Sequence, residues 1–174
     1  GNVLTLDYQG DQNGDANVTV TATSNGQTVS DAFEVTVTEA NDPPVVANAL
    51  SDLSVSEDAS DSIIALGNVF NDIDDNNASI VKTAVSSDES LVTASVAGDE
   101  LTLHYQGDQT GTATITVIGT SNAQEVNDTF TVTVTPVDDA PVTANPLEDV
   151  EVNEDAADSA IALGNVFNDI DDDN

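Results

Sequence analysis

An acidic loop sequence occurs twice in this chain, as VFNDIDDNN at residues 69–77 and as VFNDIDDDN at residues 166–174. The first copy sets Asp72, Asp74 and Asp75 within four positions of one another. Carboxylates this close together repel by about 1 kcal/mol per pair even in water. The chain holds one Lys, no Arg and 33 acidic residues, so that its formal net charge is -32. A cation is therefore the natural partner of the loop.

Carboxylates bind hard cations, and Ca²⁺ takes about six to eight oxygen ligands. The chain has no Cys, which excludes disulfides and thiolate metal sites. An EF-hand is also excluded, because counting from Asp72 its Gly position is Asn77 and its bidentate Glu position is Thr83. The alternative interpretation of the loop is a solvated acidic turn that favours solubility.

The charge and composition also exclude whole classes of partner. Nucleic acids and anionic membrane surfaces both require basic patches, which this chain lacks. No stretch approaches the ~20 apolar residues of a membrane span, so we expect no membrane insertion. Apolar residues make up 39% of the chain and alternate with polar ones, which predicts a folded chain rather than a disordered one.

The chain repeats itself at an offset of 97 residues. The sequence LTLDYQGDQNG at 4–14 returns as LTLHYQGDQTG at 101–111, and segments 42–77 and 139–174 are identical at 26 of 36 positions without a gap. A period of this length suits one small autonomous domain per repeat. We therefore expect three parts: residues 1–41 end a preceding repeat, residues 42–138 form one complete repeat, and residues 139–174 begin the next.

Within a repeat, apolar and polar residues alternate with a period of two. Ala113, Ile115 and Val117 alternate with threonines, which is typical of half-buried strands. Further strands are predicted at 45–56, 62–67, 79–86, 91–97, 100–106 and 128–135. The predicted fold is all-β: an antiparallel, seven-stranded β-sandwich of Greek-key, immunoglobulin-like type, repeated in tandem.

The same alternation predicts which side chains are buried. The expected core comprises Ile64, Leu66, Phe70, Leu101, Leu103, Tyr105, Ile115, Val117, Phe130, Val132 and Val134, with the intervening threonines outside. His104 falls on the outward phase, and the equivalent position in the preceding copy is Asp7, so we interpret it as a surface residue. Lys82, the only amine side chain, is likewise predicted to lie on the surface.

Alternating strand directions would bring the acidic loops together at the two ends of the sandwich. At the N-terminal pole the candidate calcium ligands are the loop and linker residues Asp72, Asp74, Asp75, Asn41 and Asp42, together with Asp11. At the C-terminal pole the candidates are Glu57, Asp58, Asp108, Asp138 and Asp139, facing Asp169, Asp171 and Asp172 of the next repeat. Carboxylates of two repeats that converge without a basic partner predict calcium at each junction.

Several short motifs, in a fixed order, carry a resemblance to a known family. The linkers NDPPV and DDAPV, the SED and NED turns, the VFNDIDD loops and the DAFEVTV and DTFTVTV strands resemble cadherin-like, dystroglycan-type repeats of large bacterial surface proteins and RTX-type adhesins. This resemblance implies calcium-binding β-sandwiches strung in long extracellular arrays. It places the ligand motifs on Asp72 and Asp74, Asp169 and Asp171, Asp42 and Asp139, and Glu57 and Glu154. The linker lacks the full Asp-x-Asn-Asp-Asn run of animal cadherins, so the number of ions per junction stays open.

No nucleophile with a base beside it, phosphate-binding loop or His cluster is present, so we expect no enzyme. The leading hypothesis is a structural repeat: one link of a calcium-stiffened rod outside a bacterial cell, in contact with neighbouring repeats of the same polypeptide. The first alternative is a self-assembling extracellular filament or matrix protein, in which copies of the chain join end to end by completing each other's sandwiches. The second is a sandwich that holds carbohydrate through calcium, although aromatic residues make up only 3% of the chain.

Overall fold

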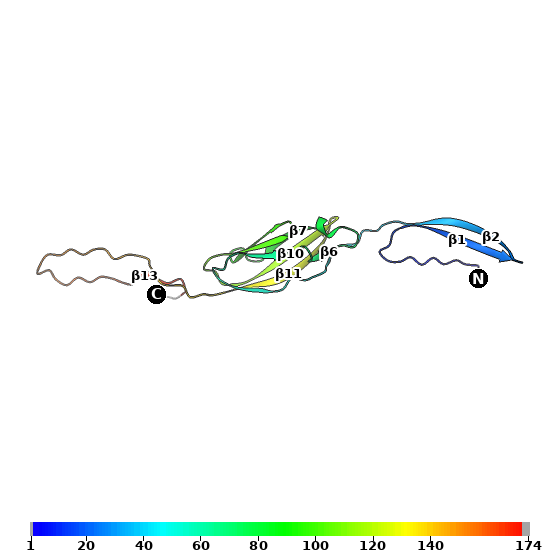
Figure 1. Ribbon diagram of the computed structural model, residues 1–174. Coiled ribbons are helices and arrows are strands. Elements are labelled where there is room, and N and C mark those ends of the chain that lie inside the picture. The colour runs from blue at the N-terminus through cyan, green and yellow to red at the C-terminus, as the bar shows by residue number, and fades with distance from the viewer. Residues whose placement is uncertain (1, 172–174) are drawn as a thin grey trace.

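The computed structural model describes residues 2–171 of the chain, so the candidate ligand Asp172 lies outside the described residues. Figure 1 shows an elongated molecule with three parts in chain order: an N-terminal hairpin, a central body and a C-terminal segment that turns back on itself. The described residues form thirteen β-strands and one short 3-10 helix, Asn77–Ser79, so the fold is all-β as predicted. No helix in this part of the chain is long and apolar enough to cross a membrane.

The larger sheet of the central body holds four strands in the order β4-β11-β10-β7. Their bounds are β4 Leu53–Ser56, β7 Val81–Ser86, β10 Gly111–Ser121 and β11 Gln124–Thr135. Strands β10 and β11 form one long hairpin, paired from Gly111 opposite Val134 to Ser121 opposite Gln124. Threonine alternates with aliphatic residues along both strands, so one face of this hairpin is apolar.

The smaller sheet holds three strands in the order β5-β9-β8. Their bounds are β5 Ser62–Ala65, β8 Val92–Ala97 and β9 Glu100–Tyr105. Both pairings are antiparallel. The turn between β8 and β9 places Gly98 at a φ of 60°, a left-handed conformation that glycine adopts without strain.

The hydrophobic core of the body lies between these two sheets. Ten of the eleven predicted core residues are buried in one cluster, and Ile64, on the edge strand β5, is half-buried against it. The cluster also contains Val69, Ile80, Leu91, Val92 and Ala113. The period-two pattern therefore located most of the core. Ala113 lies on the same phase of β10 as Ile115 and Val117, and the other additional residues lie in β8 and in the loops that flank the strands.

Residues 45–56 form two strands, where the sequence predicted one. Strand β3 (Val45–Val46) pairs with β6 (Phe70–Asn71), a two-residue strand that no pattern indicated, and only then does the chain reach β4. The backbone N–H of Leu50, between β3 and β4, donates to Asp128 of β11 at 2.6 Å. The strand is interrupted because the chain changes its pairing partner from β6 to β11 at this point.

Strand β4 pairs with β11 in parallel, which corrects the prediction of a wholly antiparallel sandwich. The register sets Leu53 opposite Val132 and Val55 opposite Val134. Both strands run from the N-terminal pole to the C-terminal pole, because β4 is the first full strand of the body and β11 is its last. Two neighbours that run the same way pair in parallel.

Lys82 is buried, so the prediction that it lies on the surface was wrong. Its side chain is 2% exposed, and its ammonium donates to Asp99 Oδ1 at 2.7 Å and to the carbonyl of Ile80 at 3.2 Å. Since Lys82 belongs to the larger sheet and Asp99 to the β8–β9 turn of the smaller one, this ion pair links the two sheets. His104 is exposed, as predicted, and its Nδ1 lies 2.8 Å from Asp61 Oδ1.

The two terminal parts contain copies of elements seen in the body. The N-terminal hairpin pairs β1 (Gly14–Ser24) with β2 (Gln27–Val37) in the register of β10 and β11, shifted by 97 residues. The C-terminal segment pairs β12 (Val142–Thr143) with β13 (Phe167–Asn168), which is the β3–β6 pairing with the same shift. Neither part forms a sheet with the body.

Candidate metal sites

The loop at residues 72–75 is curled around the side chain of Asp72. Asp72 Oδ1 accepts hydrogen bonds from the backbone N–H groups of Asp74 and Asp75, at 3.0 and 3.2 Å. The N–H of Asp72 itself donates to Asn77 Oδ1 at 2.9 Å. These bonds hold one carboxylate oxygen of Asp72 inside the loop and leave the other for a ligand.

Asp72 Oδ2 is buried and has no hydrogen-bond partner, and no other buried side-chain oxygen or nitrogen of residues 2–171 shares this state. The residue is 5% exposed. A buried polar group without a partner costs about 1–3 kcal/mol, and a charged one costs more. A carboxylate oxygen in this position is what a bound cation would satisfy.

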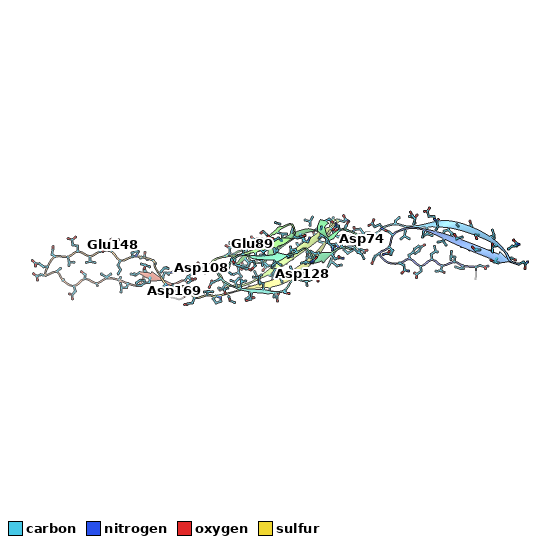
Figure 2. All side chains as sticks on the ribbon, viewed as in Figure 1. Asp74, Glu89, Asp108, Asp128, Glu148 and Asp169 are labelled. Carbon is cyan, nitrogen blue, oxygen red and sulfur yellow. The ribbon has the colours of Figure 1, made fainter. Side chains whose placement is uncertain are left out.

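The linker from the preceding part of the chain lies against this loop. The backbone N–H of Asp42 donates to Asp74 Oδ2 at 2.6 Å, so the linker and the loop are in direct contact. Asp11, from the turn before β1, lines one cleft together with Asp42 and Asp74. Figure 2 shows Asp74 at this junction, where the body meets the N-terminal hairpin.

The tip of the β10–β11 hairpin completes the N-terminal pole, and sequence reasoning missed it. The side-chain amide of Asn122 donates to Asn41 Oδ1 and to Asp75 Oδ2, both at 2.6 Å. Ser121 Oγ also donates to Asp75 Oδ2, at 3.0 Å. Asn122 adopts a φ of 45°, which asparagine tolerates in a tight turn. Asp75 Oδ2 thus accepts hydrogen bonds from two side chains of the hairpin tip. Asp75 therefore links the acidic loop to this tip.

Three carboxylates meet at the C-terminal pole. Asp58, Asp108 and Asp139 each offer an oxygen, and these oxygens lie within 4.8 Å of one another. Asp58 and Asp108 belong to two different loops, and both have a left-handed backbone, with φ values of 60° and 55°. Glu57 is buried beside them, and its Oε1 accepts a hydrogen bond from the N–H of Val137 at 2.6 Å.

The C-terminal pole repeats the linker contact of the N-terminal pole. The N–H of Asp139 donates to Asp171 Oδ2 at 2.6 Å, and the N–H of Asp171 donates to Asp169 Oδ1 at 3.1 Å. Figure 2 shows Asp108 and Asp169 at this end of the body. Desolvation raises the pKa of Asp139, and the carboxylates of its neighbours add to the increase; in decreasing order these are Asp58, Asp171, Asp108 and Glu57.

The predicted ligands thus divide into two groups. The geometry places Asn41, Asp42 and the loop acids Asp72, Asp74 and Asp75 together at one pole, with Asp11 nearby. It places Glu57, Asp58, Asp108, Asp139, Asp169 and Asp171 at the other. The side chain of Asp138 is exposed next to the second group. Asn122 also belongs to the first group, although it is far from the other members in the sequence. The only sequence feature that could have indicated its role is its place in the short turn sequence TSNAQ.

Both poles fit a hard cation. The ligand candidates at each pole offer oxygen ligands only, and the one lysine of the chain does not neutralise them, because it is paired with Asp99. Soft metals prefer sulfur or imidazole, which neither group contains. Calcium suits a flexible, carboxylate-rich set that combines side chains of several loops.

No protein-family model and no curated protein matches this chain. Among solved structures, titin domain M4 in a trigonal form aligns with 56% of this chain and 100% of that one, at 14% identity and a TM-score of 0.38. The titin domains Z1Z2 in complex with telethonin align with 71% of this chain and 62% of theirs, at 16% identity and a TM-score of 0.41. An endo-fucoidan hydrolase of glycoside hydrolase family 107 aligns with 76% of this chain, which spans 21% of the hydrolase, at 14% identity and a TM-score of 0.40. Since these likenesses are weak, the description of the fold rests on the strand pairing of the chain itself.

Proposed function

We propose that this chain is a stretch of a tandem array of calcium-binding β-sandwich repeats, and that the array is a stiff extender of an extracellular bacterial adhesin or surface fibre. Residues 42–138 are one complete repeat in this proposal, with seven strands in a Greek-key order of immunoglobulin or cadherin type. Residues 1–41 and 139–174 are parts of the repeats on either side. The observation that carries the proposal is the buried, unpartnered Asp72 Oδ2 at the junction with the linker.

Calcium would be held at the N-terminal pole by Asp72 Oδ2, with Asp74, Asp42 and Asp11 as the remaining carboxylates. At the C-terminal pole the equivalent set is Glu57, Asp58, Asp108, Asp139, Asp169 and Asp171. The ion supplies positive charge that neutralises the mutual repulsion of these carboxylates. The protein supplies preorganisation, because the hydrogen bonds to Asp72 Oδ1 and Glu57 Oε1 fix the loops before an ion arrives.

The mechanical effect follows from which part of the chain each ligand belongs to. Asp11 belongs to the hairpin before the linker, whereas Asp72 and Asp74 belong to the body after it. Asp58 and Asp108 belong to the body, whereas Asp169 and Asp171 follow the next linker. An ion shared across a linker restrains the hinge, while repulsion between bare carboxylates keeps it open. Calcium therefore acts as a stiffener of the junctions, and the sandwich core folds independently of it.

The binding strength should match an extracellular setting. Extracellular calcium modules have dissociation constants of about 10⁻⁴–10⁻³ M. A surrounding concentration on the order of 10 mM would then load such a site and stabilise it by about 1.4–2.7 kcal/mol.

Isothermal titration calorimetry with Ca²⁺ on the whole chain tests this proposal. Asp72→Asn retains the shape of the side chain and its Oδ1 acceptor but removes the charge, so we expect the N-terminal site to weaken at least about tenfold. Glu89→Gln, at an exposed carboxylate of the β7–β8 turn, is the matched control and should bind calcium as the wild type does. If both variants bind calcium equally well, or if the wild type binds none, the acidic loops are solvated turns and not calcium sites.

A further inference from the structure

The tip of the β10–β11 hairpin, residues 121–123, contacts the linker at the N-terminal pole. Asn122 and Ala123 lie between the two strands, and both have a positive φ, 45° and 62°. A type I′ hairpin turn requires this of its two central residues. The counterpart turn in the N-terminal hairpin is Asn25–Gly26, with φ values of 50° and 79°. The turn therefore recurs with the repeat and holds an asparagine at the same place in both copies.

The side-chain amide of Asn122 joins two elements that are far from it in the sequence. Its Nδ2 carries two N–H groups, and it donates to Asn41 Oδ1 of the linker and to Asp75 Oδ2 of the acidic loop, both at 2.6 Å. Ser121, beside it, donates to the same oxygen of Asp75 at 3.0 Å. One neutral side chain thus uses both of its donor groups to bridge the linker and the loop.

These contacts belong to a closed ring of hydrogen bonds. The linker also contacts the loop directly, because the N–H of Asp42 donates to Asp74 Oδ2 at 2.6 Å. Asp74 and Asp75 are fixed within the loop, since their N–H groups donate to Asp72 Oδ1. The ring therefore runs from Asn41 through the hairpin tip and the loop back to Asp42. It holds together two elements whose carboxylates repel one another.

We propose that the hairpin tip is a latch that closes the N-terminal junction, with Asn122 as its positioning residue. Asn122 does not bind the ion; it holds the linker against the loop, so that Asp42 and Asp74 lie beside Asp72 when calcium arrives. The inference rests on the proposed calcium site and adds a coupling to it. The latch and the ion both favour the closed junction, so loss of the latch lowers the calcium affinity of this pole.

The latch alone is weaker than the ion. Asn41 and Asn122 are exposed, so that water competes for their hydrogen bond, and one such bond changes an equilibrium by roughly two- to tenfold. The bare carboxylates oppose closure at the same time. In chelator the junction is therefore closed only part of the time, and calcium shifts it to the closed state. The latch sets how much calcium this shift requires.

Four variants of the whole chain separate the bridge from the turn and from the charge. Asn122→Gly removes the amide and retains a residue that tolerates a positive φ. Asn122→Asp retains the shape of the side chain but sets a carboxylate against Asp75. Asn122→Asp combined with Asp75→Asn exchanges donor and acceptor and leaves the net charge unchanged. Asn25→Asp is the matched control, because it adds the same charge to the counterpart turn at the far end of the N-terminal hairpin (Figure 1).

Backbone amide NMR spectra of the isotope-labelled chain report the two poles separately during a calcium titration. The N–H groups of Asp42 and Asp74 report the N-terminal pole, and those of Asp139 and Asp171 report the C-terminal pole. We expect Asn122→Gly to raise the calcium dissociation constant of the N-terminal pole roughly two- to tenfold and Asn122→Asp to raise it at least as much. The C-terminal pole should bind calcium as in the wild type.

The exchanged pair should recover most of the lost affinity, and Asn25→Asp should match the wild type at both poles. A second measurement, in chelator, tests the latch without calcium. Hydrogen exchange at the N–H of Asp42 should be about twofold faster or more in Asn122→Gly than in the wild type, because the partly closed junction opens further.

The possible failures are distinguishable. If the wild type binds no calcium at the N-terminal pole, the proposed function fails and the coupling fails with it, while exchange in chelator still decides whether the tip holds the linker. If the wild type binds calcium and Asn122→Gly binds it equally well, the proposed site stands and Asn122 does not position it. An effect of Asn122→Asp alone would show that the added charge is responsible, which also overturns the positioning role.

Two further results would contradict the bridge itself. Unchanged exchange at Asp42 in chelator would show that the tip does not hold the linker. An exchanged pair that binds calcium no better than Asn122→Asp would show that Asp75 acts as a ligand rather than as the partner of Asn122.

Discussion

Among the glycines of the body, Gly119 of β10 is the one at which an added Cβ would meet the shortest contact. A Cβ at this residue would lie 2.7 Å from Cδ2 and 2.8 Å from Cγ of Phe70. Phe70 is fully buried in the core and its ring has no solvent to move into. Gly119 is paired with Val126 on one side and with Lys82 on the other, so the strand cannot shift freely either.

Two opposing effects set the size of the change in Gly119→Ala. Overpacking of a well-filled core costs about 1–3 kcal/mol. Replacing glycine by alanine within a strand gains about 0.5–1 kcal/mol, because glycine loses more conformational freedom on folding. A contact of 2.7 Å forces the Phe70 ring or the strand to shift, which places the overpacking cost in the upper half of its range, about 2–3 kcal/mol. The expected net loss is therefore about 1–2.5 kcal/mol in the free energy of unfolding.

Urea unfolding followed by circular dichroism, at a fixed calcium concentration, measures this loss as a lower midpoint with an unchanged slope. Gly67→Ala is the matched control, because its nearest contact, Asp99 Oδ2 at 3.5 Å, is an ordinary one. Phe70→Leu added to Gly119→Ala should recover part of the loss, with a coupling of about 0.5–3 kcal/mol. If Gly119→Ala is as stable as the wild type, the Phe70 ring does not pack against β10 as described.

Three further predictions concern the core, the ion pair and the C-terminal pole. Phe130→Ala should cost about 3–5 kcal/mol, seen as a large drop in melting temperature, and a melt that hardly moves would contradict the core assignment. In urea unfolding, Asp99→Ala should destabilise the body more than Lys82→Met does. Asp99→Ala leaves the buried ammonium of Lys82 without its carboxylate, whereas Lys82→Met removes the buried charge itself. A larger loss of stability in Lys82→Met would refute this explanation. Because the pKa of Asp139 is raised in the folded chain, its ionised form destabilises the metal-free state at neutral pH, and the penalty disappears once both folded and unfolded forms are protonated. Asp139→Asn should therefore raise the melting temperature in chelator near pH 7 and have no effect near about pH 3, and an equal effect at both pH values would argue against the repulsion.

The period-two pattern predicted the core well because most strands have apolar residues on one phase only. It failed at β7, where both phases are mixed. Val81 and Val85 are 62% and 54% exposed, whereas Lys82 and Ser86 on the opposite phase are buried. Alternation alone does not say which of the two phases of a strand faces the core. In β7 the phase that faces the core is the less apolar one, and its Lys82 forms the ion pair with Asp99.

The candidate sites could be predicted in outline because the acidic loops recur at a fixed offset and strand direction sorts them to two poles. The finer arrangement depends on contacts between residues far apart in the sequence. Asn122 bridges Asn41 and Asp75 across the β10–β11 hairpin tip, and a single turn sequence gives no sign of such a bridge. The burial of Asp72 likewise results from the folding of its own loop around Oδ1, which the spacing of the acids does not reveal.

Small-angle X-ray scattering of the monomeric chain, collected directly from a size-exclusion column with calcium and with chelator, tests the stiffening of the junctions most directly. With calcium we expect a longer maximum dimension and the profile of a single extended shape, because both linkers are restrained. With chelator the chain should become flexible about residues 41–44 and 138–141. Asp72→Ala combined with Asp74→Ala should give flexibility at the first junction only, even in calcium. The same maximum dimension and profile with and without calcium would contradict the proposal that the ion stiffens the array.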